Sequence, residues 1–249
     1  MNTEILLDHE PVADGGYLVR ALLRITGEAP PSADRPPLNL ALVLDRSGSM
    51  GAMRKLEHAK DAASLLVRRI GEEDSVALVA YDSEVTTLAG RTPGSKRADL
   101  LGSIDRLHAG NTTNLSGGWL RGRELVAEDL VEGGVNRVLL LTDGLANVGI
   151  TEPGQLRDLV ASAAANGVST TTIGFGADYD EDLLRAMAEA GGGSTYYIEE
   201  PDQAPAVFEA EIEGLLAPDS QVGGLPQHVT MAGLKRSRPH RTPWGRGPE

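Results

Sequence analysis

The sequence predicts an α/β protein built on a doubly wound, mostly parallel sheet with helices on both faces. From residue 38 to residue 217, short apolar strands alternate with helical patterns, which is typical of parallel strands joined by crossover helices. The first of these strands, "LNLALVLD", is apolar almost throughout, as expected for a strand covered on both faces. A short N-terminal β-hairpin is predicted to precede this body.

The first half of the body is expected to begin with a strand and a helix whose apolar residues recur at helical spacing. A later strand, "EVTTLAG", is short and polar, which indicates the edge of the sheet. The loop "HAGNTTN" then leads into another helix. In order, these elements are a strand at 38–45, a helix at 54–70, strands at 75–81 and 84–90, a helix at 95–107 and a helix from about Ser116.

The second half repeats the alternation and carries clear end signals. Asn-Gly closes one helix, a run of glycines closes the next, and a proline opens the last. In order, these elements are a strand at 136–143, a helix at 154–167, a strand at 168–176, a helix at 180–193, a strand at 194–200 and a helix at 201–217.

Two segments fall outside this body. Residues 2–8 and 15–26 alternate like half-buried strands around a Gly-Gly turn. The residues after 218 have no sustained periodicity, carry a net charge of +3 and are predicted to be disordered. The expected division is therefore a hairpin at 1–30, a stiff linker at 31–37, the α/β domain at 38–217 and a basic tail at 218–249.

Composition narrows the classes of function. The 249 residues carry a net charge of −13, which argues against nucleic acid and anionic membranes as partners. The absence of cysteine excludes disulfides and cysteine-based metal sites. No apolar run is long enough to span a membrane, and the start lacks the pattern of a signal peptide, so we expect a cytoplasmic protein.

Polar side chains gather after three strands of the predicted sheet. In open parallel sheets, ligands bind beyond the carboxyl ends of the strands. The carboxylate and hydroxyl oxygens of these side chains suit Mg²⁺, with Mn²⁺ or Ca²⁺ as alternatives. Two carboxylates just neutralise a divalent ion, so such a site can accept a further anionic ligand. The residues concerned are Asp45, Ser47 and Ser49, then Thr112, Thr113 and Asn114, and finally Thr142, Asp143 and Gly144.

Other motifs fit these residues less well. An EF-hand loop starting at Asp45 would need glycine and glutamate where Met50 and Leu56 stand. No P-loop, dinucleotide fingerprint or serine-hydrolase elbow is present. A helix cap would explain Asp45 and the serines, but not the other two clusters. Two charged features are interpreted as solvated: the loop residue Arg46 and the helix stretch "RKLEHAK".

A phosphotransfer enzyme with Asp45 as nucleophile is the main alternative. Enzymes of that kind normally have a second aspartate two residues further on, where this chain has Ser47. The sequence also shows no suitably placed lysine near a strand end. A metal-dependent phosphohydrolase or phosphotransfer enzyme therefore stays the second choice.

The three clusters resemble a known family. "DRSGSM", "GNTTNLSGG" and "LLLTDGLANVG" resemble the motifs of the von Willebrand factor type A domain with its metal-ion-dependent adhesion site, and the likeness covers about residues 38–217. The chain is most similar to bacterial type A proteins of the calcium-activated chloride-channel-regulator type. The resemblance implies that Ser47, Ser49 and one loop threonine contact the metal, with Asp45 and Asp143 beside it.

The resemblance also implies which threonine this is and what the domain does. Counting from Gly110 and back from Gly117 selects Thr112, with Thr113 as the runner-up. The implied function is a non-enzymatic, metal-dependent protein-binding module, in which an Asp or Glu of a partner completes the coordination. A regulatory subunit of an ATP-driven, chelatase-like machine is a further alternative. The partner and the oligomeric state stay open.

We predict weak hydrogen-exchange protection across residues 2–26. An isolated two-stranded hairpin is marginal in water. In the bacterial proteins of this type, β-rich sequence lies on both sides of the domain, so this chain is expected to be a shortened or altered version of a longer protein. Hydrogen exchange monitored by mass spectrometry should show strong protection at 38–45 and 136–143, in contrast to weak protection across 2–26. Equal protection of the hairpin and the core would contradict the hypothesis.

Overall fold

The computed structural model describes residues 2–11, 17–26, 35–176 and 179–216, the first two ranges by their backbone alone. Strand β1 (Asn2–Pro11) pairs antiparallel with β2 (Tyr17–Thr26), so the two predicted N-terminal strands are present. The turn expected at 15–16, residues 31–34 of the predicted linker and the predicted tail lie outside the described residues.

The body is built on a six-stranded sheet in the order β5-β4-β3-β6-β7-β8. Neighbouring strands are parallel, except that β5 runs antiparallel to β4 at the edge, where the sequence predicted an edge strand. The predicted fold class is therefore confirmed. The strands are β3 (Leu38–Asp45), β4 (Ser75–Tyr81), β5 (Val85–Pro93), β6 (Val135–Thr142), β7 (Ser169–Phe175) and β8 (Gly192–Ile198).

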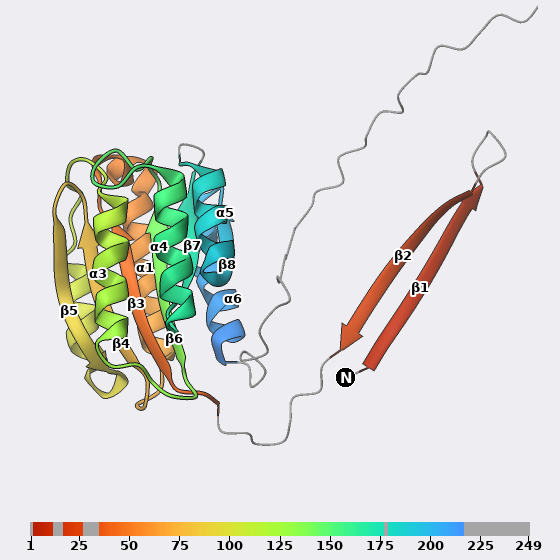
Figure 1. Cartoon of the computed structure of the whole chain (residues 1–249), viewed down its shortest axis with the longest axis horizontal. Helices are drawn as coiled ribbons and strands as arrows, with labels where there is room; N and C mark the ends of the chain where they lie inside the picture. The colour runs from red at the N-terminus through yellow and green to blue at the C-terminus, as the bar shows by residue number, and fades with distance from the viewer. Residues whose placement is uncertain (1, 12–16, 27–34, 177–178, 217–249) are drawn as a thin grey trace, which may run out of the picture.

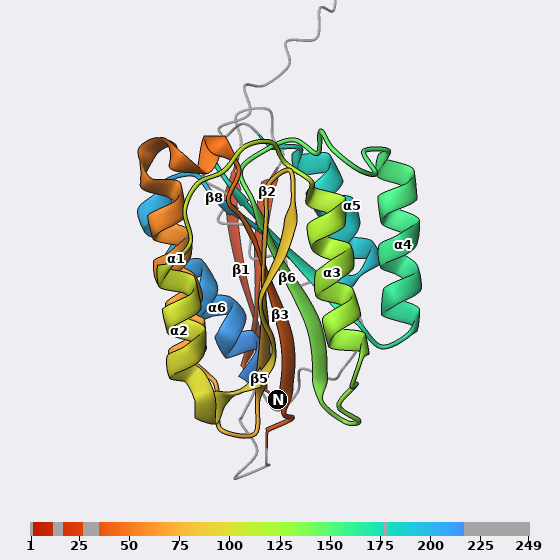
Figure 2. The same ribbon diagram turned by 90° about the vertical axis from the view of Figure 1, so that its left-hand side faces the viewer.

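Helices cover both faces of this sheet (Figures 1 and 2). One face carries α1, α2 and α6, and the other carries α3, α4 and α5. The alternation of β3 explains both contacts, because Leu40 and Leu42 pack in the first cluster while Ala41 and Val43 pack in the second. The helices are α1 (Lys55–Arg69), α2 (Arg97–Asp105), α3 (Leu115–Ala127), α4 (Pro153–Ala165), α5 (Glu181–Ala190) and α6 (Ala204–Leu216).

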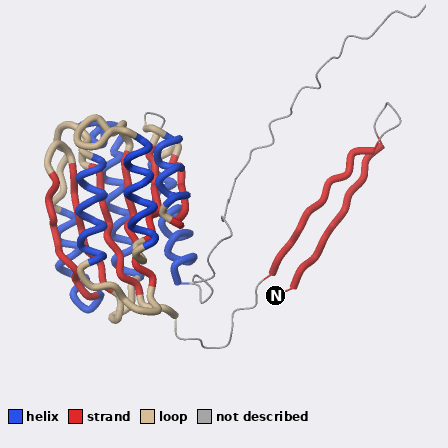
Figure 3. Tube along the Cα trace, viewed as in Figure 1, coloured by secondary structure: helices blue, strands red, loops and turns tan. Residues whose placement is uncertain are grey.

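The loops that follow the parallel strands gather at the carboxyl ends of these strands, which lie at the top of the body in Figure 3. The chain leaves β3 toward α1 on one face, whereas α3, which precedes β6, lies on the other face. The central strands β3 and β6 are paired neighbours. Their carboxyl ends therefore meet where the connections diverge, which is where open α/β sheets bind ligands.

Several element boundaries differ from the sequence prediction, and two of the differences lie at the starts of α1 and β8. A 3-10 segment (Gly48–Arg54) precedes α1, which begins at Lys55. Of the glycines predicted to end the helix at 180–193, Gly191 caps α5, whereas Gly192 and Gly193 open β8. A β-carbon on Gly193 would lie 2.1 Å from the carbonyl oxygen of Thr170, so only glycine allows β8 to approach β7 so closely here.

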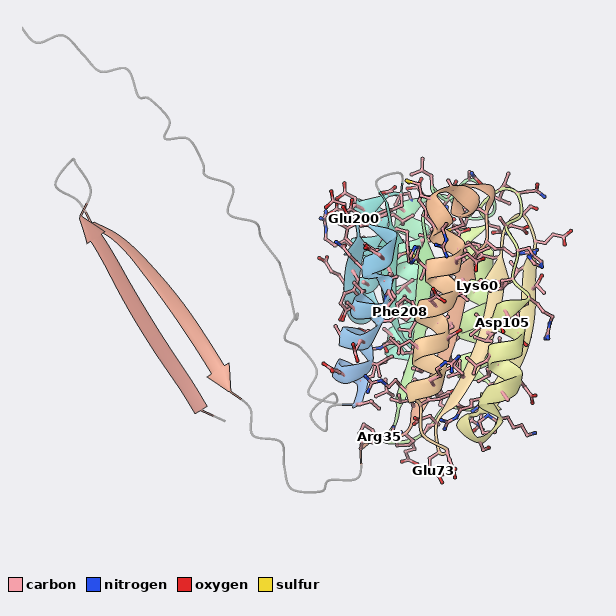
Figure 4. All side chains as sticks on the ribbon, turned by 180° about the vertical axis from the view of Figure 1, so that it is seen from behind. Arg35, Lys60, Glu73, Asp105, Glu200 and Phe208 are labelled. Carbon is pink, nitrogen blue, oxygen red and sulfur yellow. The ribbon has the colours of Figure 1, made fainter. Side chains whose placement is uncertain are left out.

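At the amino ends of the parallel strands, opposite the loops just described, a buried carboxylate has hydrogen-bond partners for both of its oxygens. Asp74 accepts two hydrogen bonds from the Arg35 guanidinium, at 2.8 and 2.7 Å. It also accepts from the backbone N–H groups of Leu38 and Gly71. Arg35 lies at this lower edge in Figure 4. The start of β3 is thereby fixed to the turn before β4.

A second buried carboxylate ties α6 to the sheet. Glu211 is 3 % exposed and accepts hydrogen bonds from Arg137 at 3.0 Å, Thr171 at 2.8 Å and Tyr196 at 2.9 Å. These partners come from β6, β7 and β8. Burial and the Glu211 charge raise the pKa of the Tyr196 hydroxyl, so it stays protonated and keeps donating.

None of the described helices is both long and apolar enough to cross a bilayer.

We predict that Glu211→Ala lowers the free energy of unfolding by roughly 3 kcal/mol, because removing one member of a buried ion pair leaves the other uncompensated. Chemical denaturation followed by circular dichroism measures this change. Glu209→Ala is the matched control on the same helix: Glu209 is 45 % exposed and pairs with Arg69, so the loss should stay under about 1 kcal/mol. Equal losses in the two variants would contradict the role of the buried network.

Candidate metal centre

The first part of the site is a carboxylate at the end of β3. Asp45 is fully buried. One of its oxygens accepts from the backbone N–H of Ser47 at 2.7 Å, and the other accepts from the Thr142 hydroxyl at 2.6 Å. Thr142 is within reach because β3 and β6 pair in register, with Leu44 beside Leu141. The sheet itself therefore brings the first and third motifs together.

The serines connect this loop to the second carboxylate. The hydroxyl oxygens of Ser47 and Ser49 lie 3.1 Å apart, and Ser49 donates to Oδ1 of Asp143 at 2.6 Å. Asp143 is fully buried, whereas Ser49 is exposed. The structure thus brings together Asp45, Ser47, Ser49 and Asp143, with Ser49 as the exposed member of this group.

The threonine loop turns a different residue inward from the one expected. Thr112 is exposed, whereas Thr113 is 4 % exposed. The N–H of Thr113 donates to the side-chain oxygen of Asn147 at 3.0 Å, and the carbonyl of Thr113 accepts from the N–H of Asn147 at 3.3 Å. A β-carbon on Gly144 would lie 3.2 Å from Oγ1 of Thr113 and 3.8 Å from Oγ of Ser49. The geometry therefore favours the runner-up Thr113 over Thr112.

A buried lysine that the sequence interpretation missed completes the cluster. Lys55 is 2 % exposed, and its Nζ donates to Oδ2 of Asp143 at 2.8 Å. The interpretation of "RKLEHAK" as a solvated face was wrong for Lys55, and so was the statement that no lysine lies near a strand end. A signal was present: Lys55 precedes Ala59 and Ala62 by four and seven residues, which places it on their buried face of the helix.

Arg46 also differs from its interpretation as a solvated loop residue. Its guanidinium pairs with Asp82 at 3.2 Å, and its side chain is 27 % exposed. Its carbonyl accepts from Gly110 at 2.6 Å, and Gly48 donates to the carbonyl of Asn111 at 2.7 Å. Arg46 therefore helps to join the first two loops of the site instead of reaching into the solvent.

The electrostatics single out Asp45. The pKa of its carboxyl is raised to about 6. Burial is the main cause and the nearby Asp143 adds to it, whereas the hydrogen bonds from Thr142 and Ser47 lower the pKa. The other buried carboxylates of the described residues each have a cationic partner: Asp74 with Arg35, Asp82 with Arg46, Asp143 with Lys55 and Glu211 with Arg137. Within the same part of the chain, Asp45 has no ion pair.

These residues fit a hard divalent cation. The donors are oxygens only, from two carboxylates and the hydroxyls of Ser47, Ser49 and Thr113, a set that suits Mg²⁺, Mn²⁺ or Ca²⁺. Gly144 keeps space among the hydroxyls that a side chain would fill. The described residues contain no cluster of three or more His, Cys, Asp or Glu side chains suited to a metal. A site with two carboxylates and several hydroxyls is consistent with that finding.

The fold and this arrangement define a type A domain. The model of the von Willebrand factor type A domain matches residues 39–210, and the chain belongs to this family. The family contains metal-dependent adhesion and protein-interaction modules. The resemblance seen in the three motifs is thereby confirmed.

Two bacterial relatives are similar over most of this chain. The uncharacterized protein YfbK of Escherichia coli is 32 % identical over 186 residues, which cover 74 % of this chain and 32 % of YfbK. The uncharacterized protein sll0103 of Synechocystis is 32 % identical over 235 residues, covering 93 % of this chain and 54 % of sll0103. The chain thus spans about a third to a half of the length of these relatives.

A solved structure shares the fold. Proximal thread matrix protein 1 from the mussel byssus, with a zinc-occupied metal-ion-dependent adhesion site, superposes with a TM-score of 0.60 at 22 % identity. The match covers 72 % of this chain and 46 % of the mussel chain. In that protein, a domain of this fold holds a divalent metal.

We predict that Thr113→Val weakens Mn²⁺ binding at least about tenfold, because it replaces an inward hydroxyl by a methyl group, whereas Thr112→Val leaves the affinity unchanged. Isothermal titration of the two variants and the unaltered chain measures the difference. The variants alter adjacent residues in the same way, so each controls for the other. Loss of affinity in Thr112→Val alone would restore the assignment made from the glycine spacing.

Proposed function

We propose that residues 38–217 form a non-enzymatic, metal-dependent protein-binding module. Asp45, Ser47, Ser49, Thr113 and Asp143 would hold the metal, which is Mg²⁺ or, as alternatives, Mn²⁺ or Ca²⁺. When bound, the ion supplies a Lewis-acidic position for an Asp or Glu side chain of a partner protein. Both carboxylates, Ser47 and Thr113 are buried, and Ser49 is the exposed residue among these five.

The observation that carries this proposal is the unbalanced charge of the cluster. Within the described residues Asp143 pairs with the ammonium group of Lys55 and Asp45 has no cationic partner, whereas the buried Asp74 near the amino ends of the parallel strands pairs with the guanidinium of Arg35. Burying a carboxylate without a cation is costly. A divalent ion at this edge would relieve that cost, and because Ser49 is exposed, an incoming carboxylate would meet neutral oxygens first.

The phosphotransfer alternative loses support from the surroundings of Asp45, although Lys55 removes one argument against it. A nucleophile must reach its substrate, but Asp45 is fully buried and both its oxygens accept hydrogen bonds. The chelatase-like alternative uses the same metal chemistry with a different partner. An affinity pull-down in Mg²⁺ or in EDTA that recovers an ATPase only with Mg²⁺ would favour that form of the proposal.

We predict that Mg²⁺ raises the melting temperature of the chain relative to EDTA. A ligand that binds only the folded state adds about 2.7 kcal/mol of stability at a hundredfold excess over its Kd. Thermal unfolding followed by circular dichroism measures the shift. Ser49→Ala should remove most of it, since this hydroxyl lies between Ser47 and Asp143.

Ser83→Ala is the control for this experiment. Ser83 is exposed in the loop after β4, and its loss should leave the Mg²⁺-dependent shift intact. An identical melting temperature in Mg²⁺ and EDTA for the unaltered chain would refute the proposed metal site.

A further inference from the structure

The buried ammonium of Lys55 is an unusual feature for a metal centre. It contacts Oδ2 of Asp143 at 2.8 Å, while Oδ1 of the same carboxylate accepts from Ser49. Only 3 % of the Lys55 side chain is exposed. A buried lysine places a fixed positive charge beside the oxygens that would bind a cation.

The surrounding backbone is shaped to hold this side chain. A β-carbon on Gly176 would lie 3.2 Å from Nζ and 3.4 Å from Cε of Lys55, and Gly176 has a φ of +73°. The two residues before Lys55 have positive φ angles as well, +49° at Met53 and +58° at Arg54. Such angles are uncommon for residues other than glycine. This turn determines where α1 begins and thus where Lys55 is placed.

The charges of the cluster can be counted in each state. Asp45, Asp143 and Lys55 together carry −1, since the neighbouring Arg46 and Asp82 form a neutral pair. A divalent cation would change this sum to +1, and a partner's carboxylate would then bring it to zero. Without Lys55, the same carboxylate would leave a net charge of −1. The lysine therefore makes the fully occupied state the neutral one.

We propose that Lys55 couples metal binding to the capture of an acidic ligand. Its charge opposes the metal when the metal binds alone, and it favours a carboxylate once the metal is present. This inference rests on the proposed function of the site. Because coupling between two ligands is reciprocal, the metal and the carboxylate each strengthen the binding of the other. Lys55 thus acts as a positioning and charge-setting residue beside Asp143.

The test is an isothermal titration of Mn²⁺ into the full chain, with and without acetate as a carboxylate probe. Lys55→Met should bind Mn²⁺ alone about tenfold more tightly than the unaltered chain, since a neighbouring charge typically changes such equilibria tenfold or more. Acetate should tighten Mn²⁺ binding in the unaltered chain and less in Lys55→Met. Lys55→Gln, which is also neutral, should behave like Lys55→Met and serves as the test if that variant does not fold.

Lys60→Met is the matched control, because it removes a lysine from the same helix and changes the net charge equally. Lys60 pairs with the exposed Glu57 and is labelled on α1 in Figure 4. Its variant should match the unaltered chain. If the unaltered chain binds Mn²⁺ but folded Lys55→Met and Lys55→Gln bind it equally or more weakly, the coupling is refuted and the metal site stands. No Mn²⁺ binding in any of the four proteins would refute the proposed function and this inference with it.

Discussion

Two carboxylates buried at the ends of neighbouring strands are the constraint on which the rest of this structure depends. Asp45 is the last residue of β3, Asp143 is the first residue after β6, and neither is exposed. Burial is the main cause of the raised pKa of the Asp45 carboxyl, and the charge of the nearby Asp143 raises it further. Both carboxylates accept hydrogen bonds from their surroundings. The donors are the hydroxyls of Thr142 and Ser49, the N–H of Ser47 and the ammonium of Lys55.

Two other buried carboxylates, Asp74 and Glu211, have cationic partners and serve only to hold segments of the fold together. Asp74 receives both arms of a guanidinium and two backbone N–H groups, and Glu211 receives one guanidinium and two hydroxyls. Each fixes one segment to the sheet and needs nothing more. The Asp45–Asp143 cluster is held by the same sheet but is left one cation short. That shortage is the observation on which the proposed metal binding rests.

Membership in the type A family places this cluster in context without deciding its details. The family match rests on residues 39–210, and the relatives YfbK and sll0103 extend well beyond the matched region. In this chain Lys55 pairs with Asp143, and under the proposed function its charge would favour an acidic partner once a metal is bound.

The sequence by itself determined the fold class, the edge of the sheet that bears the site, and the grouping of Asp45, Ser47, Ser49 and Asp143. It could do so because strand periodicity and parallel connections fix which loops meet. Only the tertiary structure favours Thr113 over Thr112, since Thr113 is buried and its N–H donates to the side chain of Asn147. It also brought Lys55 to Asp143, 88 residues away. Contacts of that kind depend on the exact start of a helix and the path of a loop, which local patterns do not encode.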